Sequence, residues 1–241
     1  MKELDGKVAL VTGASRGIGK AIAIGLAQKG ANLVLAARTV PDLEATRAQV
    51  ISHGVMAEVV PTDVTSEPQI ENMFDRTLKR FGRLDILVNN AGVFINEPLE
   101  QISTETWDRV IAIELRAPFI CTRAAFRIMK KQGGGRIINI GSISAQRVRP
   151  NTAPYNCAKF GLVGLTHTTA LEGRAFGITC GCLHPGITGD LAKNATKKVP
   201  DPMMSYEDTA ATAVYMACQP PNVNILELIQ LPINQPYLAR G

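Results

Sequence analysis

The sequence has no long apolar run, and its 241 residues begin with the polar segment MKELDGK. A membrane-spanning helix needs about 20 consecutive apolar residues, and a signal peptide needs an apolar segment close to the N-terminus. We therefore expect neither a membrane protein nor a secreted one. A cytoplasmic protein is the expectation.

The cysteines form no CxxC pair, and their number is odd. They are Cys121, Cys157, Cys180, Cys182 and Cys218. Cys180 and Cys182 flank a glycine in a strand-like segment, where side chains two residues apart share one face. Small buried hydrophobic side chains are a better interpretation than metal ligands. The sequence predicts a reduced chain without a metal site.

Basic residues exceed acidic ones by 26 to 21, but no basic run is longer than two residues. Nucleic-acid-binding proteins gather Lys and Arg on one face or along one helix. The net charge of +5 therefore indicates a mildly basic, solvated surface and no nucleic-acid partner.

Short β-branched segments alternate with longer amphipathic ones along the whole chain. We expect strands near 7–13, 31–37, 57–63, 84–92, 135–142, 177–186 and 224–232, and helices near 17–30, 41–53, 67–81, 104–131, 155–175 and 207–218. Continuous apolar strands separated by helices indicate a parallel sheet covered on both faces. No Pro/Gly/Ser-rich linker or internal repeat divides the chain. Residues 1–241 are therefore expected to form a single Rossmann-type, doubly wound α/β domain with about seven strands.

The segment TGASRGIG, residues 12–19, follows the first expected strand and opens the first helix. This is the context of a phosphate-binding turn. Gly13 allows the tight turn, Gly17 lets the backbone approach a pyrophosphate, and Gly19 lets the helix pack on the sheet. The helix N-terminus offers free N–H groups to the phosphates. The spacing is GxxxGxG and not GxGxxG, so a purely structural turn remains an alternative.

The second expected strand indicates which dinucleotide binds. Its end carries Arg38 and no acid, and Arg16 lies in the glycine turn itself. An acid at this position is typical of NAD(H) sites, whereas arginine accommodates the 2′-phosphate of NADP(H). The two arginines together favour NADP(H) over NAD(H), and a solvated surface residue remains an alternative for either one alone.

Further motifs follow in order: NNAG (89–92), GSIS (141–144), YNCAK (155–159) and PG (185–186). Together with TGASRGIG they resemble the short-chain dehydrogenase/reductase family, including carbonyl reductases of the 3-oxoacyl-carrier-protein reductase kind. The resemblance implies a tyrosine-dependent oxidoreductase that moves hydride between nicotinamide and a carbonyl or alcohol. It also implies assembly as a homodimer or homotetramer.

The same resemblance implies cofactor contacts at defined positions of this chain. The turn residues Gly13, Ser15, Arg16, Gly17, Ile18 and Gly19 are expected to bind the phosphates, and Asp63 and Val64 the adenine. Asn90, Ala91 and Gly92 are expected along the ribose and pyrophosphate. Pro185, Gly186, Ile187 and Thr188 are expected to flank the nicotinamide.

The candidate catalytic residues are Tyr155, Lys159 and Ser142. Tyr155 and Lys159 are four residues apart on an expected helix, so their side chains share one face. A free tyrosine titrates near about 10, and a nearby ammonium and the positive nicotinamide make the phenolate easier to form. Tyr155 is therefore the expected general acid in reduction and base in oxidation. Lys159 would promote its ionisation and bind the nicotinamide ribose, and Ser142 would bind the carbonyl oxygen.

Glu114 departs from the family pattern, which has asparagine at this position as a fourth catalytic residue. It belongs to a stripe that is otherwise apolar, consisting of Trp107, Val110, Ile111, Pro118, Cys121 and Ala125, and is therefore expected to face inward. In one interpretation the proton relay survives, because Pro118 lacks an N–H and frees the carbonyl of residue 114 to hold a water. Glu114 would then pair with Lys159 or join the relay.

Two other interpretations of Glu114 remain open. A buried carboxylate beside Lys159 could cancel part of the charge that promotes ionisation of Tyr155, which would weaken turnover or move it to alkaline pH. Alternatively, Glu114 could rotate outward and pair with Arg116.

The substrate pocket is expected to be shaped by residues 93–100, 143–153 and a lid at 187–204. Arg147, Arg149, Lys193, Lys197 and Lys198 make these segments basic. An acidic substrate such as a carrier-bound acyl thioester is one interpretation, and a solvated lid is the other. His53, His167 and His184 show no acidic or nucleophilic partner at an informative spacing, so we interpret them as structural.

Two functions therefore remain. The first is an NADP(H)-dependent carbonyl reductase or alcohol dehydrogenase acting on a small molecule. The second is an NADP(H)-binding sensor or scaffold whose turnover is impaired by Glu114. The C-terminal segment from residue 224 lacks the glycine-rich ending of many family members, which leaves the mode of assembly open.

Overall fold

The computed structural model describes residues 2–197 and 202–236. Its centre is a seven-stranded sheet in the order β3-β2-β1-β4-β5-β6-β7, and every pairing is parallel. The strands are β1 (Val8–Thr12), β2 (Asn32–Ala37), β3 (Ala57–Pro61), β4 (Ile86–Asn89), β5 (Gly135–Ile140), β6 (Ile178–Pro185) and β7 (Glu227–Gln230). The predicted doubly wound α/β fold is confirmed.

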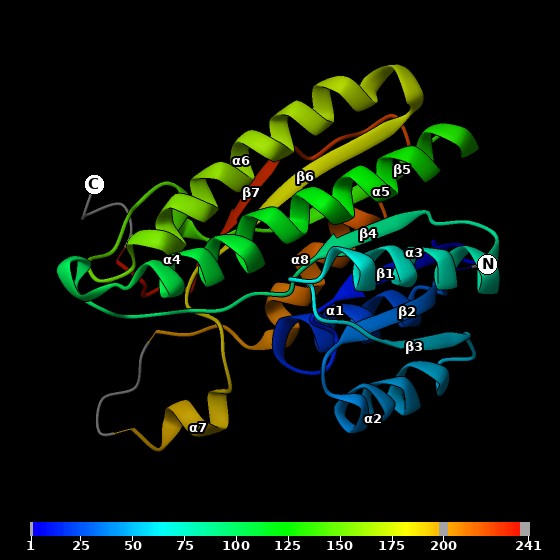
Figure 1. Cartoon of the computed structure of the whole chain (residues 1–241). Helices are drawn as coiled ribbons and strands as arrows, with labels where there is room; N and C mark the ends of the chain where they lie inside the picture. Colours follow the sequence, from blue (N-terminus) through cyan, green and yellow to red (C-terminus); the bar gives the residue numbers. More distant parts are fainter. Residues whose placement is uncertain (1, 198–201, 237–241) are drawn as a thin grey trace.

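Helices cover both faces of the sheet (Figure 1). One face carries α1 (Gly17–Gln28), α2 (Val40–Ile51) and α8 (Tyr206–Ala217). The other carries α3 (Glu67–Phe81), α5 (Ala117–Gln132) and α6 (Ala153–Gly173).

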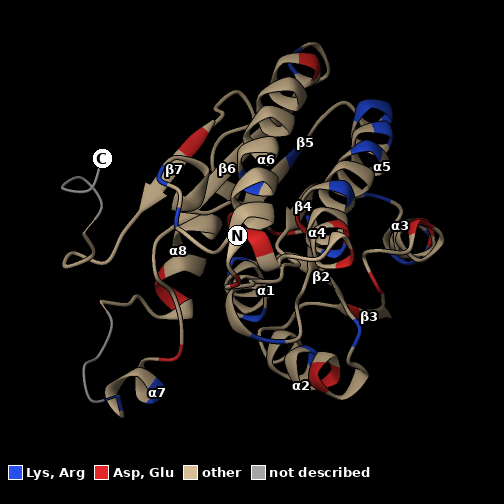
Figure 2. Ribbon diagram, turned by 60° about the vertical axis from the view of Figure 1, so that its left-hand side comes forward, with Lys and Arg blue, Asp and Glu red and all other residues tan. Residues whose placement is uncertain are grey.

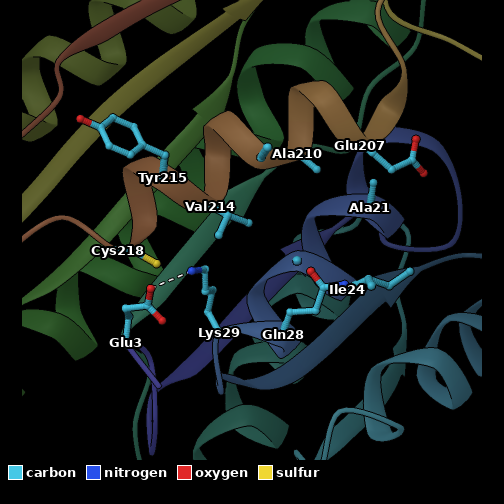
Figure 3. A pocket seen from close by; sticks show the side chains of 12 residues that line it. Glu3, Ala21, Ile24, Gln28, Lys29, Glu207, Ala210, Val214, Tyr215 and Cys218 are labelled. Atoms are coloured by element: carbon cyan, nitrogen blue, oxygen red, sulfur yellow. Dashed lines mark hydrogen bonds and ion pairs between the residues drawn. The ribbon is translucent and has the colours of Figure 1, made fainter. Parts of the chain in front are cut away.

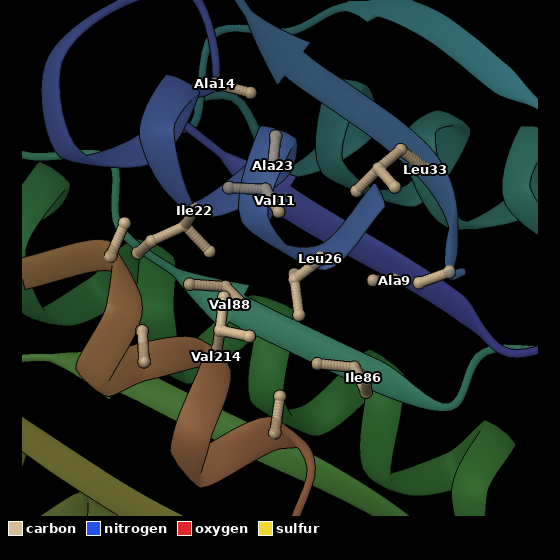
Figure 4. Packing of buried hydrophobic residues seen from close by; sticks show 14 of the residues in the cluster. Ala9, Val11, Ala14, Ile22, Ala23, Leu26, Leu33, Ile86, Val88 and Val214 are labelled. Atoms are coloured by element: carbon tan, nitrogen blue, oxygen red, sulfur yellow. The ribbon is translucent and has the colours of Figure 1, made fainter. Parts of the chain in front are cut away.

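Successive side chains of β1 point to opposite faces of the sheet. Ala9 and Val11 pack beneath α1 and α8 (Figure 4), while Leu10 packs with the residues of α3 and α5. All three side chains are fully buried. Because side chains alternate along a strand, two covered faces require the unbroken apolar strands seen in the sequence.

The helix expected over residues 104–131 is divided in the structure. It consists of α4 (Thr104–Ile111), a π-helical turn at Ala112–Arg116, and α5. In this turn the N–H of Ala117 donates to the carbonyl of Ala112, a bond of the i→i+5 type. Pro118 has no N–H with which to continue the α-helical pattern from Glu114. The structure therefore corrects the expectation of one continuous helix.

The segment after β6 returns to the body of the protein. It contains the short helix α7 (Leu191–Ala195), and a bridge joins Thr188 to Met204. Lys198, and the part of the expected lid from 198 to 201, lie outside the described residues.

Charges of both signs are distributed over the helices, and the last turn of α5 carries Lys130 and Lys131 (Figure 2). Cations at a helix C-terminus interact favourably with its dipole. Within residues 2–197 and 202–236, no helix has the length and apolar character needed to cross a membrane.

Candidate active site

The glycine turn lies between β1 and α1 at the carboxyl edge of the sheet. Gly13 has φ 68° and Gly17 has φ 58°, values that favour glycine. A Cβ on Gly13 would lie 2.8 Å from Nδ2 of Asn90 and 2.9 Å from Cα of Ala91. The turn therefore packs directly against the end of β4, at the point where the strand order reverses and ligands bind in such folds.

Thr12 and Asn90 join the glycine turn to the NNAG motif. The Thr12 hydroxyl oxygen accepts hydrogen bonds from the N–H groups of Asn90 (3.0 Å) and Ala91 (3.1 Å). In return, the Asn90 side-chain amide donates to the Thr12 carbonyl at 2.9 Å. Within the described ranges, no side chain caps the N-terminus of α1. Its first N–H groups therefore suit phosphate oxygens, and this edge of the sheet fits a dinucleotide.

The side chains expected to read the cofactor lie at the ends of the neighbouring strands. Arg16 and Arg38 are both exposed. Hydrogen bonds from the backbone N–H and hydroxyl of Thr65, together with the nearby Arg38, hold the pKa of Asp63 below its usual value. Val64 is buried in the core. Convergence of the two arginines on one phosphate stays a prediction.

The candidate catalytic residues share one cavity of about 470 Å³. Its lining includes Glu114, Ser142, Tyr155 and Lys159, and, from the expected cofactor set, Ile18, Asn90, Gly92, Pro185, Gly186 and Thr188. The remaining residues of that set (Gly13, Ser15, Arg16, Gly17, Gly19, Arg38, Asp63, Val64, Ala91 and Ile187) lie outside this lining. Strands β4, β5 and β6 end at the cavity, so the topology assembles the site.

Glu114 forms an ion pair with Lys159 inside the protein. Oε2 of Glu114 lies 2.9 Å from Nζ of Lys159, and their side chains are only 2% and 7% exposed. The other carboxylate oxygen accepts a hydrogen bond from the N–H of Val93. Glu114 faces inward as predicted, and the interpretation that it pairs with Arg116 is wrong. Arg116 instead forms an ion pair with Glu67 at 2.8 Å.

The environment of Lys159 keeps it charged. Burial alone would lower the pKa of Lys159, but the Glu114 carboxylate and Tyr155 raise it well above its ordinary value. The ammonium also donates to the carbonyl of Ile140 at 2.8 Å. It lies 5.4 Å from the centre of the Tyr155 ring.

Tyr155 and Ser142 approach the cavity from α6 and from the end of β5. The ring of Tyr155 meets that of Phe94 edge-on, with 5.4 Å between ring centres. The hydroxyl oxygen of Ser142 accepts a hydrogen bond from the N–H of Ser144 at 3.1 Å. This bond uses the oxygen as an acceptor, so the hydroxyl hydrogen can still donate. Phe94 is a lining residue that we did not predict individually.

The C-terminal segment reaches the end of β6. The N–H of Ile187 donates to the side-chain oxygen of Gln235 at 2.8 Å, so this N–H is already engaged. The hydroxyls of Thr188 and Thr209 are 3.0 Å apart. Gln235 is 48 residues from Ile187 in the chain, and no local pattern could have indicated the contact. The same holds for Tyr206, whose ring packs against Gly17.

His184 is fully buried beside Ser142. Its Nδ1 lies 2.9 Å from the Ser142 carbonyl oxygen, and its Nε2 lies 3.1 Å from Oε2 of Glu227. The other oxygen of Glu227 lies 2.8 Å from Nε2 of His167. His167 and His184 thus have an acidic partner that the spacing of the sequence did not indicate. Pairing of β6 with β7 supplies the partner.

A second cleft, also of about 470 Å³, lies between α1 and α8 (Figure 3). The exposed pair Glu3 and Lys29 lies at its edge, with 2.7 Å between the charged atoms. The remainder of its lining includes Ala21, Ile24, Val214 and Tyr215. None of the candidate catalytic or cofactor residues lines it.

Comparisons with known proteins agree with this geometry. The chain is 36% identical over 231 residues to a 3-oxoacyl-[acyl-carrier-protein] reductase from Synechocystis sp., covering 91% of this chain and 92% of that protein. It is 41% identical over 198 residues to a D-beta-hydroxybutyrate dehydrogenase from Rhizobium meliloti, covering 81% and 76%. A crystal structure of a metagenomic short-chain oxidoreductase in complex with NADP has a TM-score of 0.86 and 34% identity, covering 97% and 100%.

The family model described as short chain dehydrogenase matches residues 7–200. This range contains the glycine turn, the NNAG motif and all the candidate catalytic residues. The metagenomic relative is in complex with NADP, and an alcohol dehydrogenase from Thermococcus sibiricus, 28% identical with a TM-score of 0.87 and covering 95% of this chain and 97% of that one, is complexed with 5-hydroxy-NADP. The chain belongs to the short-chain dehydrogenase family of oxidoreductases.

Proposed function

We propose that this oxidoreductase uses NADP(H) to interconvert a ketone or aldehyde and the corresponding alcohol. The observation that carries the proposal is the shared cavity, in which Ser142, Tyr155 and Lys159 face the residues after β6. This arrangement combines a proton donor, a cation and a hydroxyl donor beside the expected nicotinamide position. A bound NADPH would supply the hydride.

In the direction of reduction, Tyr155 donates its phenolic proton to the carbonyl oxygen as that oxygen gains negative charge. Ser142 donates its hydroxyl hydrogen to the same oxygen and stabilises the developing alkoxide. The ammonium of Lys159, 5.4 Å from the Tyr155 ring centre, stabilises the phenolate left behind. Oxidation of an alcohol uses the same groups in reverse.

Glu114 distinguishes this site from that of an oxidoreductase with asparagine at the position. We propose that its carboxylate holds Lys159 and joins the proton relay that restores the proton of Tyr155. The second candidate function follows from the same contact. A carboxylate 2.9 Å from the Lys159 ammonium offsets part of the charge available to Tyr155, which favours an NADP(H)-binding sensor or scaffold with impaired turnover.

Preference for NADP(H) over NAD(H) rests on Arg16 and Arg38, both exposed at the cofactor edge, and on the relative that binds NADP. Arg38→Asp would repel a 2′-phosphate. It should weaken NADPH binding at least about tenfold more than NADH binding. Equal losses for both cofactors, measured by fluorescence titration, would mean that Arg38 does not read the phosphate.

The substrate is proposed from the relatives, because the residues of the cavity do not specify it. A 3-oxoacyl reductase and a D-beta-hydroxybutyrate dehydrogenase both have names that denote an oxygen function at the third carbon of an acyl chain. We propose a small carbonyl compound of this kind as substrate, and a homodimer or homotetramer in the cytoplasm as the active form.

The test is NADPH consumption with 3-oxoacyl thioesters, 3-oxo acids, diketones and simple ketones. Wild-type turnover with at least one class is expected. Tyr155→Phe should lower kcat at least about a hundredfold while NADPH still binds, because only the proton donor is removed. Turnover by Glu114→Asn but not by wild type would favour the sensor or scaffold.

A further inference from the structure

We infer that His184 and Glu227 are positioning residues for Ser142, and that they hold the turn after β5 in the geometry that the reaction requires. The inference rests on the proposed function, because it concerns the residue that would bind the reacting oxygen. His184 on β6 and Glu227 on β7 contact each other and the turn after β5. Neither is among the candidate catalytic residues Ser142, Tyr155 and Lys159.

The hydrogen-bond geometry fixes which nitrogen of His184 contacts Ser142 as a donor. A main-chain carbonyl can only accept, so Nδ1 of His184 donates to the Ser142 carbonyl at 2.9 Å. The opposite nitrogen lies 3.1 Å from a carboxylate oxygen of Glu227. His184 therefore joins Ser142 to Glu227 through its two ring nitrogens.

The bridge acts on the buried backbone segment at Ser142, which other hydrogen bonds also hold. Ser142 lies in extended backbone with φ −169° and ψ 155°. Its carbonyl accepts from the N–H of Ala145 at 3.0 Å as well as from His184. Its hydroxyl oxygen accepts from Ser144. The imidazole thus fixes the carbonyl side of the same residue whose hydroxyl would face the substrate.

Gly141 makes this approach possible. A Cβ at Gly141 would lie 2.8 Å from Nδ1 of His184 and 2.6 Å from the sulfur of Cys182. A larger residue would push the imidazole away from the Ser142 carbonyl. The absence of a Cβ at Gly141 therefore leaves the space that the buried imidazole of His184 occupies between Ser142 and Glu227.

This arrangement positions Ser142 and does not conduct protons. Glu227 extends the contacts outward to His167, whose side chain is 46% exposed. At the inner end, however, the chain of contacts stops at a main-chain carbonyl, which accepts a hydrogen bond but passes no proton onward. His184 and Glu227 therefore act through the orientation of Ser142.

Two substitutions separate the two contacts of His184. Asparagine places an amide nitrogen near the position of Nδ1, so His184→Asn retains a donor for the Ser142 carbonyl. Glutamine reaches instead toward the position of Nε2, so His184→Gln retains the link to Glu227 and loses the donor to Ser142. His53→Gln, at a histidine distant from the site, is the matched control.

We expect His184→Gln to lower kcat about tenfold to a hundredfold, since small misplacements of reacting groups cost this much. His184→Asn should retain kcat within about threefold. The dissociation constant of NADPH should stay unchanged in both. Equal kcat values in wild type, His184→Asn and His184→Gln would overturn the inference. So would an equal fall in both variants, because the Asn donor would then be without effect.

A readout without substrate keeps the inference separate from the proposed function. In His184→Gln, hydrogen exchange at the Ala145 amide should be about tenfold faster, because local opening of the turn becomes easier. His184→Asn should show exchange between that of wild type and that of His184→Gln, because it keeps the donor to Ser142 but loses the link to Glu227. If the wild type reduces no carbonyl compound, the proposed function fails, and unchanged exchange in His184→Gln would overturn the positioning role by itself.

Should His184→Gln fail to fold, Glu227→Gln takes its place in both measurements. It leaves the imidazole in position but replaces the carboxylate that contacts Nε2 of His184. A fall in kcat of about threefold with faster Ala145 exchange supports the inference, and wild-type values in both overturn it.

Discussion

Two carboxylates lie behind the candidate catalytic residues, and their surroundings differ. Glu114 pairs with Lys159 where both side chains are closed off from solvent, at 2% and 7% exposure. Glu227 pairs with the buried His184, but its own side chain is 30% exposed and it also contacts His167. Glu114 and Lys159 come from the π-helical turn and α6, whereas Glu227 and His184 come from the neighbouring strands β7 and β6.

The difference shows how solvent changes what an ion pair does. Removing one member of a buried pair leaves a charge without water or partner, which is costly. A carboxylate that touches solvent can recover part of its hydration, so losing its partner costs less. Glu114 should therefore matter most to stability, and Glu227 to the orientation of Ser142.

The most demanding test of this comparison is the same substitution at both positions. Glu114→Gln should lower the free energy of unfolding by about 3 kcal/mol, whereas Glu227→Gln should lower it by about 1 kcal/mol. Urea denaturation of the cofactor-free proteins measures both. Equal losses would mean that burial does not distinguish the two pairs.

A smaller change at Gly92 probes the space around the Glu114 carboxylate. A Cβ at Gly92 would lie 2.7 Å from Oε1 of Glu114. Gly92→Ala should therefore destabilise the protein by about 2 kcal/mol, the usual cost of overpacking. The matched control is Gly164→Ala on α6, where a Cβ meets no atom within 4 Å.

The control substitution should have the opposite sign. Alanine inside a helix is more favourable than glycine by about 1 kcal/mol, so Gly164→Ala should stabilise the protein. Thermal unfolding of the two variants under one buffer condition gives the comparison. Destabilisation of similar size in both would contradict the close approach of Gly92 to Glu114.

The smallest expected effect is the one that alkaline pH has on the stability contributed by the buried Glu114–Lys159 pair. Because the pKa of Lys159 is raised, the pair stabilises the fold fully below the ordinary lysine value of about 10.4. That contribution is lost only as pH rises through the raised value. The difference in free energy of unfolding between wild type and the double variant Glu114→Gln/Lys159→Met, which removes both charges, should vary by less than about 0.5 kcal/mol from about pH 7 to about pH 10. A steady decrease over this range would contradict the raised value.

The order of strands and helices could be predicted because both faces of the sheet are covered. Apolar runs such as VALVT in β1 have every residue buried, so the strands stand out from the helical segments. The inward position of Glu114 was predictable in the same way, from its place in an apolar stripe. Its contact with Lys159 was one of the interpretations that the sequence allowed.

The contacts made by β7 and the C-terminal segment could not be predicted. Glu227 is 43 residues from His184, and Gln235 is 48 residues from Ile187. Each pair meets only because β7 lies beside β6 in the sheet. Spacing along the chain carries information about neighbours on one helix or strand, and not about two strands joined by a long connection.

The π-helical turn at Ala112–Arg116 also has a consequence for how this protein could change over evolutionary time. A turn closed by i→i+5 bonds contains one residue more than an α-turn. Deleting a single residue there would restore the α-helical pattern without turning α4 relative to α5, because the wider turn is what accommodates the extra residue. Gain or loss of this feature among relatives would be recorded as a one-residue gap in an alignment, and not as an exchange of one amino acid for another.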